Sequence, residues 1–215
     1  MPQEDKNFCT IYLVRHGETE MNKNGVLQGH LDSPLTELGV EQVNATAQEL
    51  KDVSFDAIFS SDLERAVRTA EIVRLERQIA IQTSKMLRER SYGSYEGKSS
   101  EQYRKNFRET FEKIKTLSNK DRMDFKLASD IESDGEVVGR FVTRLREIGV
   151  AYAGKTVLVV SHGACMRTFL THLGYAKYEE LLIGAISNGA FVKVLCDGVD
   201  FFIKEVKGVK RPNSG

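Results

Sequence analysis

The stretch TIYLVRHGET, residues 10–19, joins an apolar run directly to charged and polar residues. Residues 10–14 are mostly strand formers, and they predict a strand buried on both faces of a parallel sheet. Arg15, His16 and Gly17 follow without a gap. Ligands of open α/β sheets bind just beyond the carboxyl ends of the strands, so this change of polarity indicates a candidate site. Taken alone, the same residues are equally consistent with a solvated Arg15 and a structural His16.

Length and composition predict a single domain over residues 1–215. The chain has 215 residues, of which 40% are hydrophobic, so it can bury a full core. Its 31 Lys and Arg residues balance 31 Asp and Glu residues, which argues against a general binder of nucleic acid or anionic membranes. No apolar stretch is long enough to cross a bilayer, and residues 1–7 lack the apolar segment of a secretory signal.

The cysteine and histidine positions show no metal-binding pattern. Three scattered cysteines provide neither a disulfide framework nor metal-ligand spacing, which favours a reducing cytoplasmic location. The four histidines, at positions 16, 30, 162 and 172, form no HxxxH or HExxH pair, so we expect no zinc site.

Strand and helix patterns alternate along the chain. We expect helices over residues 36–50 and from 63 to about 73, with Ser61 and Glu64 as a capping box. Short apolar runs predict strands at 56–59, 79–81 and 156–160, and a helix that follows Gly163 should close at Gly174. Residues 190–195 and 201–206 flank an Asp-Gly hairpin signal. These features predict an α/β three-layer sandwich, in which helices cover both faces of a mostly parallel sheet with an antiparallel pair near the C-terminus.

Residues 99–130 differ in character from the rest. Tyr103, Phe107, Phe111 and Ile114 recur at helical spacing within a stretch that is dense in charge and lacks strand signals. We interpret this stretch as a helical insertion that covers the site. A solvated helix packed at the edge of the domain explains the pattern as well. Ser133 and Glu136 then predict another capping box at the start of the next helix.

Each of four predicted strands is followed by polar residues, and parallel strands would gather them at one edge of the sheet. These residues are Arg15 with His16, Ser61 with Arg65, the run Arg88, Glu89 and Arg90, and Ser161, His162 and Gly163. Guanidinium groups match phosphate oxygens bidentately, and the helix that begins near Gly163 would point free N–H groups at the same place. Asn22 adds a neutral donor, whereas a Walker A loop and a magnesium-binding Asp cluster are absent from the sequence.

Two histidines beside two arginines indicate nucleophilic catalysis on phosphorus. A neutral imidazole can attack phosphorus and carry the phosphoryl group, and neighbouring Arg charge lowers its pKa and keeps it neutral. Glu89 is the candidate that protonates the leaving oxygen and later activates water. Alternatively, Glu89 forms a surface ion pair with Arg88 or Arg90.

These motifs together resemble the histidine phosphatase superfamily, the phosphoglycerate-mutase-like group. The resemblance runs from about residue 11 to about residue 195 through LVRHGET with Asn22, DSPLTELG, SSDLERA with Thr69 and Ala70, LRE with Gly93, and VSHG. It implies that His16 is the phosphorylated nucleophile, that Arg15, Arg65 and His162 complete the phosphate pocket, and that Glu89 is the proton donor. The resemblance also implies that no metal or cofactor is needed. We predict a substrate-binding set formed by Asn22, Gln28, Gly29, Arg90, Tyr92, Lys98 and Gly163.

The superfamily contains both phosphatases and mutases. Glu89, Arg90, Tyr92 and Lys98 partly match the mutase pattern, but the adjacent arginine pair that grips a substrate carboxylate in mutases is absent from residues 99–130. We therefore expect a phosphatase that acts on a small phosphorylated metabolite, with a cofactor-dependent phosphoglycerate mutase as the alternative. A non-catalytic binding protein is a third hypothesis, although all five catalytic positions are filled. The sequence leaves a homodimer open.

Overall fold

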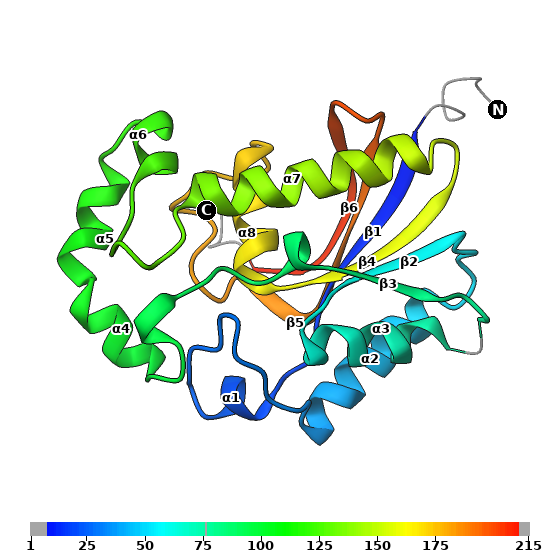
Figure 1. Cartoon of the computed structure of the whole chain (residues 1–215), viewed down its shortest axis with the longest axis horizontal. Coiled ribbons are helices and arrows are strands. Elements are labelled where there is room, and N and C mark those ends of the chain that lie inside the picture. The colour runs from blue at the N-terminus through cyan, green and yellow to red at the C-terminus, as the bar shows by residue number, and fades with distance from the viewer. Residues whose placement is uncertain (1–7, 76, 211–215) are drawn as a thin grey trace.

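A six-stranded sheet forms the centre of the molecule (Figure 1). A computed structural model describes residues 8–75 and 77–210, so the prediction for residues 1–7 lies outside the described residues. The strand order is β3-β2-β4-β1-β5-β6. The strands are β1 Cys9–Arg15, β2 Ala57–Ser61, β3 Ile81–Ser84, β4 Thr156–Ser161, β5 Ile186–Cys196 and β6 Phe201–Val209. Strands β1 to β4 are parallel and the β5–β6 hairpin is antiparallel, which confirms the predicted fold class.

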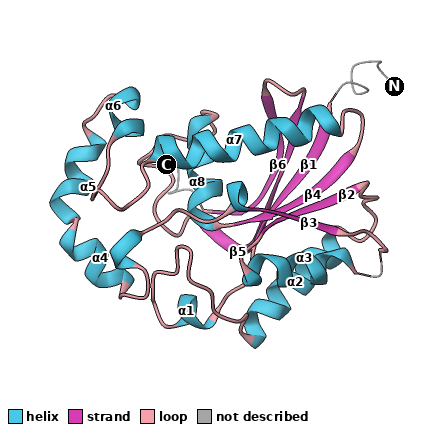
Figure 2. Ribbon diagram, in the orientation of Figure 1, coloured by secondary structure: helices cyan, strands magenta, loops and turns pink. Residues whose placement is uncertain are grey.

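Helices cover both faces of this sheet (Figure 2). One face carries α2 Glu37–Glu49 and α3 Glu64–Arg74, and the other carries α7 Asp134–Ala151 and α8 Gly163–His172. Successive side chains of β1 point to opposite faces of the sheet and pack into both cores. Ile11 and Leu13 belong to the core under α7 and α8, while Tyr12 and Val14 belong to the opposite core. None of the described helices is long and apolar enough to span a membrane.

The segment between the sheet and α7 is helical, as predicted for residues 99–130. It contains α4 Ser100–Asn106, α5 Arg108–Lys115 and α6 Asn119–Asp124, which extend to the left of the sheet in Figure 1. The residues at helical spacing between 103 and 114 belong to two helices rather than one, since Phe107 is both the C-cap of α4 and the N-cap of α5. Its ring packs 5.1 Å from those of Tyr95 and Tyr103, so the aromatic spacing reflects a cluster at a helix junction. The role of this segment as a cover for the site stays a prediction.

Two local predictions were wrong in detail. Ser61 does not form a capping box with Glu64, because it is still part of β2 and the N-cap of α3 is Leu63, without a side-chain cap. The free N–H groups at that helix end donate instead to the Asp32 carboxylate, which comes from a distant loop. The third strand spans residues 81–84 rather than 79–81, since edge strand β3 is only partly buried and tolerates polar residues.

Other local signals were confirmed. Ser133 and Glu136 form the predicted capping box at α7. Gly174 follows the C-cap of α8 with a φ of 71°, and Gly198 has a φ of 97° in the β5–β6 hairpin. Both residues adopt the left-handed region that favours glycine.

The register of the parallel strands brings their carboxyl ends to one level. Arg15 lies opposite Ser161 in the β1–β4 pair, and Ser60 lies opposite Val160 in the β2–β4 pair. The N–H of His16 donates to the Ser161 carbonyl at 3.1 Å, which extends the β1–β4 pairing by one residue. His16 and His162 therefore lie at the same level, each directly after the end of one of two neighbouring strands.

Two glycines let the loop after His16 approach α2 closely. A Cβ at Gly39 would lie 2.0 Å from the Glu18 carbonyl oxygen, and a Cβ at Gly17 would lie 2.4 Å from the Gly39 carbonyl oxygen. Backbone on both sides leaves no room for a side chain at either position. This contact holds the loop that carries His16 against the first turn of α2.

We predict that Gly39→Ala lowers the free energy of unfolding by about 1–3 kcal/mol, because the new methyl group overpacks the backbone of Glu18. Chemical denaturation measures the change. The matched control is Gly139→Ala on α7, where a Cβ would meet nothing within 4 Å. It should stabilise the protein by about 0.5–1 kcal/mol through helix propensity. Equal effects of the two substitutions would contradict the close approach.

Candidate active site

A cavity of about 560 Å³ opens at the carboxyl edge of the parallel strands. It is lined by ten of the predicted site residues, namely Arg15, His16, Asn22, Gln28, Gly29, Arg65, Glu89, Arg90, Tyr92 and Gly163. His162 lies behind this surface, fully buried against His16. Lys98 does not line the cavity. Its ammonium group lies 5.3 Å from the centre of the Tyr95 ring, so the prediction that it binds substrate receives no support from its position.

The two histidine rings are packed against each other at the floor of the cavity. Their centroids are 5.1 Å apart, and His16 is only 2% exposed. The Nδ1 atom of His16 lies 2.7 Å from the carbonyl oxygen of Gly17. A carbonyl oxygen can only accept, so Nδ1 carries the proton and Nε2 keeps its lone pair. This tautomer leaves His16 with one free nucleophilic nitrogen.

His162 is a buried imidazole with unused hydrogen-bonding capacity. Neither of its ring nitrogens has a hydrogen-bond partner among the described residues. Buried polar groups are rarely left in this state, and such exceptions concentrate at functional sites. A ligand oxygen is the kind of partner that would satisfy this ring.

Burial and positive charge keep both imidazoles neutral. Burial lowers the pKa of His16 well below its usual value, and the charges of Arg65 and Arg15 lower it further. The pKa of His162 is lowered in the same way, first by burial and then by Arg65. Neutral rings beside guanidinium groups suit an anionic ligand, since the site has positive charge but the nucleophile keeps its lone pair.

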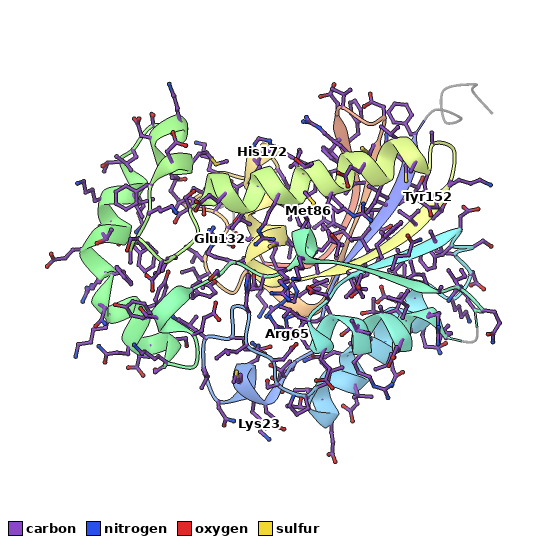
Figure 3. The ribbon with its side chains drawn as sticks, viewed as in Figure 1. Lys23, Arg65, Met86, Glu132, Tyr152 and His172 are labelled. Carbon is purple, nitrogen blue, oxygen red and sulfur yellow. The ribbon has the colours of Figure 1, made fainter. Side chains whose placement is uncertain are left out.

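Arg65 is the arginine most deeply enclosed by the site. It is 1% exposed and lies near the middle of the molecule (Figure 3). Its Nη1 donates to the Asp32 carboxylate at 2.8 Å and to the Leu31 carbonyl, while its Nη2 donates to the Gly29 carbonyl. Its Nε is buried without a partner in the described part of the chain. The guanidinium is thus fixed on one side and retains one free donor.

Arg15 lies where α8 begins. Its Nη1 donates to the Ile186 carbonyl, and its buried Nε has no partner within residues 8–75 and 77–210. A Cβ at Gly163 would lie 3.0 Å from that Nε, so the glycine lets the guanidinium approach the N-terminus of the helix. The cation and the free N–H groups of the helix therefore converge on one place.

Among the described residues, Glu89 accepts hydrogen bonds only from backbone N–H groups. Its Oε1 accepts from Arg90 and Cys165, and its Oε2 accepts from Ala164. The alternative of a surface ion pair was wrong, because Arg88 binds Asp62 and Arg90 binds Asp134. The backbone at the start of α8 thereby holds a carboxylate that lines the cavity and has no ion pair among the described residues.

Three residues that support this arrangement were given no role from the sequence. Arg140 on α7 donates to the carbonyl oxygens of Met86, Arg88 and Glu89 and forms an ion pair with Glu132, so it holds the loop that carries Glu89. Two polar side chains hold the backbone around His16. Asn188 donates to the His16 carbonyl, and the Thr69 hydroxyl accepts from the Gly17 N–H. Thr69 was named beside SSDLERA without a role, whereas Arg140 and Asn188 had no local signal because their contacts join segments that are far apart in the sequence.

The predicted substrate-binding residues form the wall beside this centre. The Oδ1 atom of Asn22 lies 3.4 Å from the Asn188 side-chain nitrogen and from the Thr19 N–H, which leaves its own NH2 group as a donor. Tyr92 packs edge to face on Tyr103, with centroids 5.6 Å apart. The wall is therefore partly aromatic, whereas the floor is formed by histidine and arginine.

Neutral imidazole, convergent guanidinium groups and an adjacent carboxylate define a phosphoryl-transfer site. Comparisons with known proteins agree, because the family model for the histidine phosphatase superfamily (branch 1) matches residues 11–207. The chain therefore belongs to the histidine phosphatase superfamily.

Individual relatives cover most of the chain. The uncharacterized phosphatase PhoE of Bacillus subtilis is 33% identical over 190 residues, which are 86% of this chain and 90% of that protein. Phosphoglycerate mutase-like protein 4 of Arabidopsis thaliana is 34% identical over 167 residues, 77% of this chain and 71% of that one. Among solved structures, Bacillus stearothermophilus YhfR superposes with a TM-score of 0.80 at 30% identity and covers 94% of this chain and 98% of its own. The sequence relatives thus carry both phosphatase and mutase names.

The lowered histidine pKa values predict how stability depends on pH. Because both rings stay neutral when folded, the unfolded chain binds more protons below its usual histidine pKa of about 6.5. Stability should therefore fall as pH decreases from 7 toward 5, by up to about 1.4 kcal/mol per pH unit for each buried ring. His162→Gln should reduce this slope by about half. Urea denaturation at pH 5, 6 and 7 measures it, and an unchanged slope would contradict the neutral buried state.

Proposed function

We propose that this protein is a phosphomonoester hydrolase that works through a phosphohistidine on His16. The observation that carries the proposal is the orientation of His16, whose Nδ1 lies against the Gly17 carbonyl while its Nε2 is free beside two arginines. A nucleophile in this state needs no activation by a base, because its lone pair is already available.

In the proposed first step, the substrate phosphate binds between Arg15, Arg65 and His162. Their free donors match the oxygens of a phosphoryl group, and their charge stabilises the transition state. The Nε2 atom of His16 attacks phosphorus and the ester P–O bond breaks. In this step the carboxyl group of Glu89 gives a proton to the leaving oxygen, which would otherwise depart as a strongly basic alkoxide, and becomes a carboxylate.

In the proposed second step, water takes the place of the departed alcohol. Glu89, now a carboxylate, accepts a proton from this water as the water attacks phosphorus. The N–P bond breaks, inorganic phosphate forms and neutral His16 is restored. The same carboxylate thereby serves as acid and base in turn, and the loop held by Arg140 keeps it in place.

A phosphatase is favoured over a mutase by what surrounds the cavity. A mutase must retain its reaction partner and exclude water while the phosphoryl group returns. The adjacent arginine pair expected for that task does not occur in residues 99–130. A small phosphorylated metabolite suits the size of the cavity, which lies within the range of small-molecule sites. Three buried thiols are consistent with the proposed cytoplasmic location.

We predict that the protein releases phosphate from p-nitrophenyl phosphate in the presence of EDTA. His16→Ala should lower kcat by at least about 10³-fold, because the nucleophile is lost. The matched control is His172→Ala, which removes an exposed histidine from the last turn of α8, outside this cavity (Figure 3). That control should retain wild-type activity.

Two outcomes would contradict the proposal. Full activity of His16→Ala would exclude this residue as the nucleophile. Conversion of 3-phosphoglycerate to 2-phosphoglycerate that is faster than phosphate release, and that depends on 2,3-bisphosphoglycerate, would favour the mutase. The two reactions can be followed in the same sample by measuring free phosphate and the two isomers.

A further inference from the structure

One buried arginine of the cavity has no carboxylate partner. Three arginines are buried in the described part of the chain, Arg65, Arg90 and Arg167. The first two form ion pairs, with Asp32 and Asp134 respectively. Arg167 is 7% exposed and donates to the Leu181 carbonyl at 3.2 Å, but no Asp or Glu of the described residues lies within ion-pair distance. A buried charge without a counterion is unfavourable unless a ligand supplies one.

A second arginine lies against the same aromatic ring. The guanidinium of Arg167 is 5.2 Å from the centre of the Tyr178 ring, and that of Arg122 is 4.7 Å from it. Both arginines and the tyrosine line the cavity. The Nε atom of Arg122 is buried and has no hydrogen-bond partner among the described residues. Stacking on Tyr178 therefore holds two guanidinium groups in place and leaves donors available.

Asp134 is an acidic group that interacts with both arginines, and it is already engaged in an ion pair. Burial alone would raise the pKa of Asp134, but the charges of Arg90 and then Arg167 lower it. Asp134 directs its ion pair to Arg90. The charge of the cavity lining is also positive among residues 8–75 and 77–210, where seven Arg and Lys residues but four Asp and Glu residues line it in a chain of zero net charge. This excess favours an anionic ligand with more charge than one phosphate.

The position of Arg167 separates this cluster from the phosphate pocket. Arg167 lies four residues beyond Gly163 on α8, which corresponds to about 6 Å along the helix axis. A small metabolite can span that distance with two anionic groups.

We propose that Arg122, Tyr178 and Arg167 form a second-anion subsite, which binds a carboxylate or a second phosphate on the same small molecule that presents its phosphoester to His16. The inference rests on the proposed function, because it names the substrate class of that site. Arg167 supplies the buried charge and Arg122 closes the subsite from α6. Monoesters without a second anion are then poor substrates.

Matched pairs of esters test this subsite. In the first pair, 3-phosphoglycerate has a carboxylate where glycerol 3-phosphate has a hydroxymethyl group. In the second pair, fructose 1,6-bisphosphate has one phosphate more than fructose 6-phosphate. We expect kcat/KM to be at least about tenfold higher for the charged member of one pair, and the pair that responds identifies the anion. Arg167→Met should remove this preference by lowering kcat/KM for the charged ester. It should lower the hydrolysis of p-nitrophenyl phosphate much less than that. Arg167→Lys should restore part of the preference.

Arg104→Met is the matched control. Arg104 lines the same cavity, but it is exposed and its guanidinium donates to Ser100 of its own helix. The Arg104→Met substitution should leave the ratio of the two kcat/KM values within each pair of esters unchanged. No preference within either pair, a preference that survives in Arg167→Met, or an equal loss in Arg104→Met would overturn the subsite.

Binding to His16→Ala separates this inference from the proposed function. Calorimetry with the same four esters reports affinity without turnover, so the second-anion subsite can be tested even in a protein that hydrolyses none of them. Tighter binding of a charged ester, lost in the His16→Ala, Arg167→Met double variant, supports the subsite. Equal binding of both members of each pair contradicts it. Failure to hydrolyse p-nitrophenyl phosphate contradicts the proposed function instead.

Discussion

The parallel pairing of β1 with β4 is the constraint on which the site depends. Arg15 lies opposite Ser161, so the next residue on each strand is a histidine and the two rings meet at 5.1 Å. A slip of one residue would reverse the facing of every side chain of β1 and remove Ile11 and Leu13 from their core. The hydrophobic pattern that selects the register of the sheet therefore also positions the reactive groups.

Burial and charge then determine the protonation state of the two histidines, and with it the reaction that this site can perform. Burial and the nearby guanidinium groups lower the pKa of both histidines, so the rings remain neutral next to positive charge. Each arginine is held on one side by carbonyl or carboxylate oxygens, while the Nε atoms of Arg15 and Arg65 remain free. Such donors are fixed before a phosphate arrives, so little reorganisation is needed in the transition state. In the proposed second-anion subsite farther along α8, Arg167 is likewise held in place before an anion binds, by its contact with the Tyr178 ring.

The parts of this protein that depend on local sequence patterns could be predicted from the sequence. Apolar runs predicted the parallel strands, and polar residues at their ends predicted Arg15, His16, Arg65, Glu89 and His162. Contacts between distant segments were not predictable in this way. Asp32 caps α3 from another loop, Arg140 holds the backbone of Glu89 across about fifty residues, and Asn188 reaches the His16 carbonyl from β5. Lys98 matched a family pattern, but its position depends on packing against Tyr95.

The most direct test of the central claim is to trap the phosphorylated protein. A few seconds of turnover with excess p-nitrophenyl phosphate, followed by quenching in base and peptide mass spectrometry, should locate one phosphoryl group on His16. The modification should be labile in acid, as expected for a phosphorus–nitrogen bond, and absent from His16→Ala. A phosphoryl group on another residue, or none at all while phosphate is being released, would contradict the account.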